Sequence, residues 1–181
     1  MSIGKIFFLV VAFTVLSGSI ASFASGQDMK DQNRHRAAIK TDSRQAVYFP
    51  AKMQKHILAD MRDHLRALSE ILTAMSVGEY TNAAHIARAR LGLNSPSAAG
   101  CTGSGASVHA CTAPSADMVR MMERFMPKGM RKMGRAMHKS ASAFAAVAAQ
   151  TEKSGDAKKA YAALARVTLH CVACHAVYKM R

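Results

Sequence analysis

The residues best able to do chemistry lie close to the C-terminus, in the run Cys171-Val172-Ala173-Cys174-His175. Two thiols three positions apart share one face of a helix. They can therefore bind the two vinyl groups of one porphyrin, while the imidazole that follows points at the iron. This C-x-x-C-H pattern is the attachment signature of c-type haem. It predicts one covalent haem (haem c) with His175 as an axial iron ligand.

Residue types alone leave two other uses of the cysteine pair open. A redox dithiol of the thioredoxin kind should follow a strand and open a helix, whereas Cys171 and Cys174 fall near the end of a chain with helical periodicity. A structural zinc site would need further Cys or His ligands at suitable spacing. This context favours haem over a redox dithiol and over zinc.

The second axial position decides what a haem iron can do. Met61 is the candidate ligand, because it belongs to the apolar stripe of a helix expected over about 51–77. Met61 could also cover an open iron face or fill core space, as methionine often does. His56 and His64 lie beside the stripe and are expected at the surface or on its flank. The stripe consists of Leu58, Met61, Leu65, Leu68, Leu72 and Met75.

Further helices should position this site. A second helix is expected over about 79–91 after the turn at Gly78, and a third helix or helix pair should run to about Glu152, with Pro127 in the first turn of its main part. Asp156 is a plausible N-cap for a last helix that reaches the C-terminus. The residues expected on inner faces are Tyr80, Ala84, Ala87, Leu91, Met130, Met133, Met137, Ala141, Phe144, Ala148, Ala160, Leu164, Val167, Cys171, Cys174 and Tyr178.

The third helix is amphipathic, with a basic outer face formed by Lys128, Arg131, Lys132, Arg135 and Lys139. Its methionine-rich start could suggest soft-metal binding, for example of Cu(I). Core packing is the favoured explanation, since half of these methionines lie on the apolar stripe.

Four amphipathic helices with short joints and no strand alternation predict an all-α fold, an antiparallel four-helix bundle over 50–181. The Gly- and Ser-rich segment 92–115 is expected to form a loop insertion that lies apart from the haem. It carries Cys101 and Cys111, which lack a following histidine and therefore mark no second haem. In an oxidising compartment they should form a disulfide, with two separate thiols as the alternative.

The N-terminal residues 1–24 are typical of a signal peptide. Lys5 precedes an apolar run over 6–16, and Ser22-Phe23-Ala24 offers the small residues that a signal peptidase reads. We expect cleavage after Ala24 and export to the periplasm, with a retained membrane anchor as the alternative. The polar stretch 25–49 should be a flexible lead-in. No other apolar run is expected to reach spanning length, so no stable membrane span should remain.

The net charge of the 181-residue chain is strongly positive. It falls from +14 to +13 when Lys5 leaves with the signal peptide, because Lys5 is the only charged residue before Asp28. Such a charge favours an acidic protein partner or an anionic membrane surface. Export argues against nucleic acid. The sequence leaves monomer and homodimer equally open.

A C-x-x-C-H motif close to the C-terminus, on the last of four helices, resembles the cytochrome c-prime superfamily, the class II c-type cytochromes that include the low-spin c556 proteins. The resemblance covers about 50–181 and is most specific at Cys171, Cys174, His175 and the following Tyr178-Lys179. It implies that Lys179, four positions after the ligand histidine, lies close to the haem.

The resemblance also implies that Met61 stands at or next to the family's distal position, which Met occupies in c556-type members. Ile57 and Leu58 stand where an arginine is expected in the family one turn before that position. This departure weakens a five-coordinate site that binds NO or CO, which stays as the alternative. A six-coordinate one-electron carrier is the expected function. No hydrolase or transferase motif is present, and we do not expect an enzyme.

Overall fold

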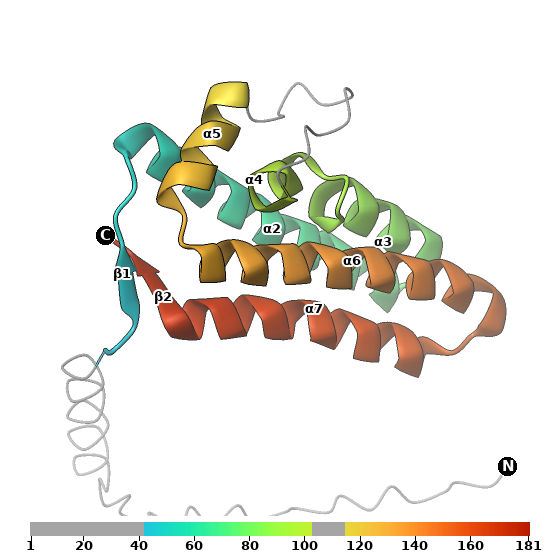
Figure 1. Cartoon of the computed structure of the whole chain (residues 1–181). Helices are drawn as coiled ribbons and strands as arrows, with labels where there is room; N and C mark the ends of the chain where they lie inside the picture. Colours follow the sequence, from blue (N-terminus) through green and yellow to red (C-terminus); the bar gives the residue numbers. More distant parts are fainter. Residues whose placement is uncertain (1–41, 103–114) are drawn as a thin grey trace, which may run out of the picture. The chain divides into compact units, whose positions relative to one another are not determined.

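The computed structural model describes residues 42–102 and 115–181, and this part of the chain is mostly helical, as predicted (Figure 1). The expected signal peptide, most of the expected lead-in and Cys111 lie outside the described residues. The elements are, in order, β1 (Gln45–Val47), α2 (Ala51–Ser76), α3 (Tyr80–Ile86), a π-helical turn η1 (Ala87–Leu91), a 3-10 turn η2 (Pro96–Ala98), α4 (Ala99–Thr102), α5 (Ala116–Phe125), α6 (Lys128–Ser154), α7 (Ala157–Val177) and β2 (Tyr178–Met180).

The helix boundaries follow from local chemistry at their ends. Gly78 (φ 82°) and Gly155 (φ 69°) adopt left-handed backbone conformations after α2 and α6, which glycine reaches without steric cost. Pro127 precedes the first residue of α6. The carboxylate of Asp156 accepts a hydrogen bond of 3.3 Å from the amide of Lys159, so Asp156 is the N-cap of α7 as predicted.

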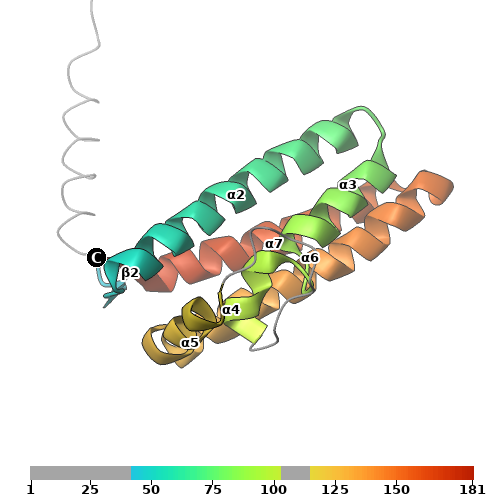
Figure 2. The ribbon, with the colours of Figure 1, turned by 90° about the horizontal axis from the view of Figure 1, so that it is seen from above.

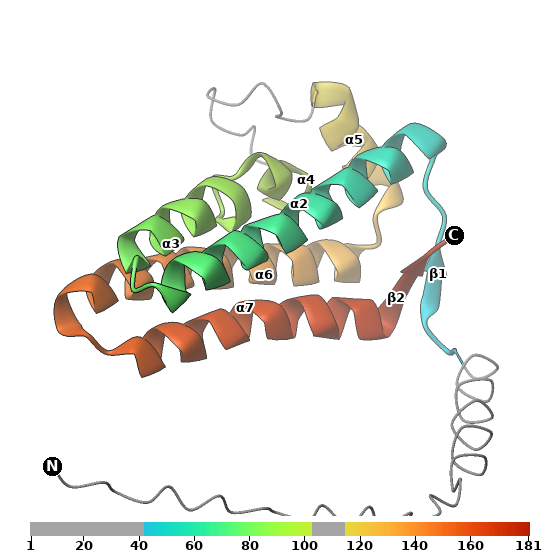
Figure 3. The same cartoon turned by 180° about the vertical axis from the view of Figure 1, so that it is seen from behind.

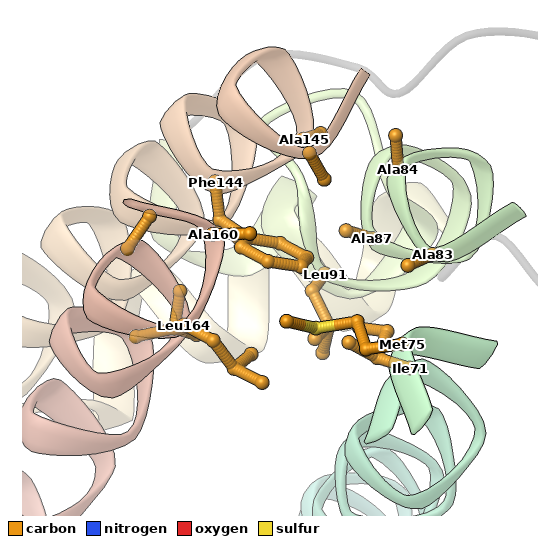
Figure 4. Packing of buried hydrophobic residues seen from close by; sticks show 14 of the residues in the cluster. Ile71, Met75, Ala83, Ala84, Ala87, Leu91, Phe144, Ala145, Ala160 and Leu164 are labelled. Atoms are coloured by element: carbon orange, nitrogen blue, oxygen red, sulfur yellow. The ribbon is translucent and has the colours of Figure 1, made fainter. Parts of the chain in front are cut away.

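One buried cluster joins α2, α3, η1, α6 and α7. Figure 4 shows the Phe144 ring reaching in from α6 toward Ile71 and Met75 of α2 and Leu164 of α7. Many of the surrounding residues are alanines, whose small side chains let helices approach closely. Seen from above, α3 lies between α2 and α6 (Figure 2), and α6 and α7 lie side by side along their length (Figure 3). The alanines are Ala67, Ala74, Ala83, Ala84, Ala87, Ala141, Ala145, Ala148, Ala160 and Ala163.

The predicted inner face of α6 is confirmed for Met130, Met137, Ala141, Phe144 and Ala148, which are buried. The predicted stripe of α2 is largely wrong. Leu58, Leu65 and Leu72 are 39%, 68% and 50% exposed, and Met61 and Leu68 are half-buried. The residues that α2 buries are Met53, Ile57, His64, Ala67, Ile71, Ala74 and Met75.

The buried stripe of α2 is shifted by one residue from the predicted stripe, which corresponds to a rotation of the helix by about 100°. Ile57 and Ile71, with His64 between them, have the same seven-residue spacing as Leu58, Leu65 and Leu72, so two overlapping stripes compete in the sequence. Ile71 of the second stripe packs in the cluster around Phe144, and Arg90 of η1 pairs with residues next to that stripe. Its guanidinium donates a 2.6 Å hydrogen bond to Asp63 Oδ1 and also binds Glu70, which holds η1 against this side of α2.

A short parallel sheet was not predicted. β1 pairs with β2 in the register Gln45↔Tyr178, Ala46↔Lys179 and Val47↔Met180. Strand β1 lies inside the expected flexible lead-in, and β2 ends α7 before the C-terminus that this helix was expected to reach. Val47 is buried next to methionines of α2, α5 and α6, which explains why this part of the lead-in is ordered.

Residues 92–102 also differ from the expected loop. They contain η2 and α4, with Ser95, Ala98 and Ala99 buried against the helices. The amide of Leu93 donates a 3.0 Å hydrogen bond to Ser142 Oγ on α6. Small side chains let this segment pack closely, so a composition typical of loops does not make it an exposed loop here.

Candidate haem-attachment site

The two motif cysteines lie in the last two turns of α7. Cys171 is half-buried against the alanine-rich cluster around Phe144, and its Sγ lies 3.7 Å from the carbonyl oxygen of Val167. Cys174, one turn later, is half-buried against a second cluster rich in methionine. Both thiols therefore lie on the side of α7 that faces the rest of the molecule, as the spacing predicted. The second cluster consists of Val47, Phe49, Met53, Ile57, Met118, Met122, Met126 and Met130.

The electrostatic surroundings of these thiols do not suit a redox dithiol. Burial raises the pKa of the Cys171 thiol, and burial together with the charge of Cys171 raises the pKa of Cys174. A reactive dithiol needs a lowered pKa, which a helix N-terminus supplies. Here the pair lies at the C-terminal end of α7, where the helix dipole disfavours an anion. The arrangement favours thiols that stay protonated near neutral pH.

The structure does not gather the further ligands that a zinc site would need. Among residues 42–102 and 115–181, no group of three or more His, Cys, Asp or Glu side chains is placed to hold a metal ion. His175 itself is exposed at the last turn of α7. Its imidazole is thus accessible to a bound group rather than buried in the core.

Met61 of α2 is half-buried at the edge of the methionine-rich cluster. Cys174 packs against the same cluster. The structure therefore brings the first long helix and the C-x-x-C-H turn of α7 to one place, although they are more than 100 residues apart in sequence. Met53, the next methionine toward the start of α2, is fully buried in that cluster.

Exposed apolar side chains flank the site on both helices. Leu58 and Leu65 on α2 lie on either side of Met61 in sequence, and Val172 on α7 lies between the two cysteines and is 64% exposed. A contiguous exposed apolar patch marks a ligand or partner site, whereas single exposed apolar side chains are common on any protein surface. A porphyrin is a large apolar plate, so residues of these types, next to paired thiols and an imidazole, fit a haem.

The same exposure makes α7 unusual for a helix of a packed fold. By length and composition alone it would suffice to cross a membrane, because its most apolar window has a mean hydropathy of 1.3. Only 22% of that window is buried. This finding differs from the expectation that no further apolar segment reaches spanning length. The N-terminal half of α7 nevertheless buries Ala160, Leu164 and Val167 in the alanine-rich cluster.

Cys101 lies closer to the site than expected. Its Sγ rests on Gly134 of α6, where an added methyl group would overlap it. Burial, together with the charges of Cys174 and Asp60, raises the pKa of the Cys101 thiol to about 11, although Arg131 opposes this shift. The expectation that the 92–115 segment lies apart from the haem site is therefore wrong for Cys101. Its predicted disulfide with Cys111 involves a residue outside the described part of the chain.

The histidines of α2 differ in environment. His56 is half-buried, its Nε2 lies 3.5 Å from Asp60 Oδ2 and lacks a well-formed hydrogen bond, and burial raises the pKa of Asp60 despite the opposing effect of His56. His64, expected at the flank, is buried instead. Its Nε2 lies 2.9 Å from Ser97 Oγ, and its ring makes an edge contact with His138 of α6 at a centroid distance of 5.7 Å.

Two basic residues approach the end of α7. Lys179 lies in β2, where it is half-buried and pairs with Ala46. Arg44, just before β1, donates a hydrogen bond of 3.4 Å from Nη1 to the backbone carbonyl oxygen of His175. Sequence reasoning missed Arg44, because nothing in the polar stretch 25–49 signals that it folds back onto the last helix.

Comparison with known proteins identifies no relative: no family model, curated protein or solved structure matches this chain.

Proposed function

We propose that this chain is an exported c-type cytochrome that carries one covalent haem and acts in one-electron transfer. The observation that supports this proposal most is that Met61 and Cys174 both pack against the methionine-rich cluster, with the exposed His175 next to Cys174 in sequence. Paired thiols followed by an imidazole are the groups that a c-type haem requires, and a thioether can supply its sixth ligand.

In this proposal, Cys171 and Cys174 bind the two vinyl groups and His175 is the proximal iron ligand. Each cysteine would form one thioether by adding its S–H across one vinyl double bond, so that no other group has to leave. Met61 is the sixth ligand, and its half-buried position leaves the thioether accessible. The bound haem supplies the one-electron couple, while the apolar side chains of α2 and α7 exclude water from it.

The architecture belongs to the same proposal. We propose that α2, α3 with η1, α6 and α7 form an antiparallel four-helix bundle of the cytochrome c-prime superfamily, of the c556 type. The short joints at Gly78 and Gly155 support this arrangement, since helices joined by such turns pack as antiparallel neighbours. Strands β1 and β2 are additions to that plan.

The partner we propose is an acidic redox protein of the periplasm. The outer face of α6 exposes Lys128, Lys132, Arg135 and Lys139. A positive face of this kind accelerates the encounter with an acidic protein and loses its effect as salt increases. Nucleic acid and a stable membrane span have no place in this function, and monomer and homodimer both accommodate it.

The alternative function is that of a five-coordinate haem protein that binds NO or CO. It is favoured by one observation, the half-burial of Met61, which could cover the iron without binding it. The absorption spectrum of the haem-loaded protein separates the two functions. Sharp low-spin bands in the reduced protein support electron transfer, whereas a broad high-spin spectrum that shifts on addition of carbon monoxide overturns it.

A further inference from the structure

The two ends of the region 43–181 meet beside the candidate axial histidine. Strand β1 comes immediately before α2, and β2 follows the last residue of α7. Their parallel pairing is extended by a hydrogen bond of 3.1 Å from the amide of Arg181 to the carbonyl oxygen of Val47. The clip, by which we mean residues 44–47 with 178–181, therefore joins the lead-in to the segment that follows the C-x-x-C-H motif.

Side chains fix both strands of the clip. Val47 is buried in the methionine-rich cluster, and Phe49 follows it there two positions later. On the other strand, the Tyr178 hydroxyl lies so close to Gly129 of α6 that any side chain at Gly129 would overlap it. The clip is thus packed from two directions, and this packing fixes the backbone next to Arg44, whose own side chain is exposed.

Arg44 meets α7 at its C-terminal end. The last four carbonyl groups of a helix lack partners within the helix, and the helix dipole gives this end a partial negative charge. The guanidinium of Arg44 donates to one of these groups, the carbonyl oxygen of His175 itself. A cation held there interacts favourably with the helix end and lies beside the residue that would bind the iron.

We propose that Arg44 is a positioning residue for His175 and that its charge raises the reduction potential of the bound haem. This inference rests on the proposed function. Oxidation adds one positive charge at the iron, and a nearby cation opposes that change through Coulomb repulsion. Through the carbonyl oxygen of His175, Arg44 also holds the last turn of α7, from which the imidazole extends.

The test compares the midpoint potentials of haem-loaded Arg44→Gln, Arg44→Lys and the parent protein. Arg44→Gln removes the charge and shortens the side chain, so at a fixed solution potential the ratio of reduced to oxidised haem should fall about threefold at low salt. The difference should shrink as salt screens the charge. Arg44→Lys should restore most of the ratio. The control is Arg166→Gln, an exposed cation of α7 nine residues before His175, which should change the ratio less.

A second measurement tests the clip without haem. Amide hydrogen exchange at Tyr178–Met180 in the haem-free full chain should be faster in Arg44→Gln than in Arg166→Gln. Equal changes of potential in these two variants would overturn the proposed electrostatic role, and equal exchange would overturn the positioning role. A chain that never acquires covalent haem would refute the proposed function, while faster exchange in Arg44→Gln would still support the positioning role of Arg44 at α7.

Discussion

The Nδ1 atom of His138 on α6 lies 2.8 Å from the carbonyl oxygen of Leu91, the last residue of the π-helical turn. A carbonyl oxygen only accepts, so Nδ1 carries the proton and donates it. The His138 ring in turn contacts His64, whose Nε2 is close to Ser97. Two buried imidazoles therefore link α2 and α6 to the segment that leads to Cys101.

This pair predicts a loss of stability in acid. Burial lowers the pKa of His64 to about 4 and also lowers that of His138, while the unfolded chain binds protons below about 6.5. The stability that depends on these two neutral imidazoles is fully present above pH 6.5. It is lost as the pH falls from there through about 4, because the unfolded chain then binds more protons than the folded chain. For His64 the loss is on the order of 3 kcal/mol.

Denaturant unfolding at pH 7.5 and pH 4.5 measures this effect. His64→Gln keeps a hydrogen-bonding side chain next to Ser97 but does not titrate, so its free energy of unfolding should vary less with pH than that of the parent. His85→Gln, at an exposed position of α3, is the matched control and should retain the parent's pH dependence. Identical slopes in the His64 variant and the parent would contradict the assignment.

Replacement of Cys171 and Cys174 by alanine should abolish covalent haem. In the parent protein the porphyrin should stay with the polypeptide through acid-acetone extraction, because thioether bonds survive it, and in the double variant it should be extracted. Each single variant should retain one thioether bond. Haem that resists extraction in the double variant would show that these thiols are not the attachment site.

Met61→Ala tests the sixth ligand. Loss of a soft thioether donor should lower the potential, make the iron high-spin and open it to carbon monoxide. Because Met61 is only half-buried, its cavity cost should be smaller than the 2 to 5 kcal/mol typical of a buried methionine. Met53→Ala is the control, since it empties a fully buried position of the same cluster and should change stability more than the spectrum. The weak charge-transfer band of methionine-bound ferric iron decides the matter: its survival in Met61→Ala would assign the role to another methionine.

Gly134→Ala should destabilise the protein, because the new methyl group overlaps Cys101 Sγ. Shortening the neighbour relieves this overlap, so the same substitution should cost less in a Cys101→Ala background, with a coupling of about 0.5 to 3 kcal/mol in a double-mutant cycle of thermal or denaturant unfolding. Gly134→Ala should also alter the visible spectrum, as Cys101 lies near Cys174. Additive effects of the two substitutions would show that Cys101 does not rest on Gly134.

The helical elements were largely predictable from sequence, because local chemistry determines them. The turns at Gly78 and Gly155, the cap at Asp156 and the inner face of α6 all depend on residues within one or two turns of each other. The C-x-x-C-H motif is local in the same way, since three-residue spacing on a helix places both thiols on one face regardless of the surroundings. The haem itself stays a prediction.

Tertiary packing decided what sequence patterns left ambiguous or hidden. Two equally spaced stripes run along α2, and only the packing of α2 against other elements decides which of them is buried. Arg44 acquires a role only when β1 pairs with β2, across more than 130 residues, and Cys101 reaches Gly134 only through the packing of α4 on α6. Contacts between distant segments depend on the packing of whole faces, so no spacing rule within a single segment reports them.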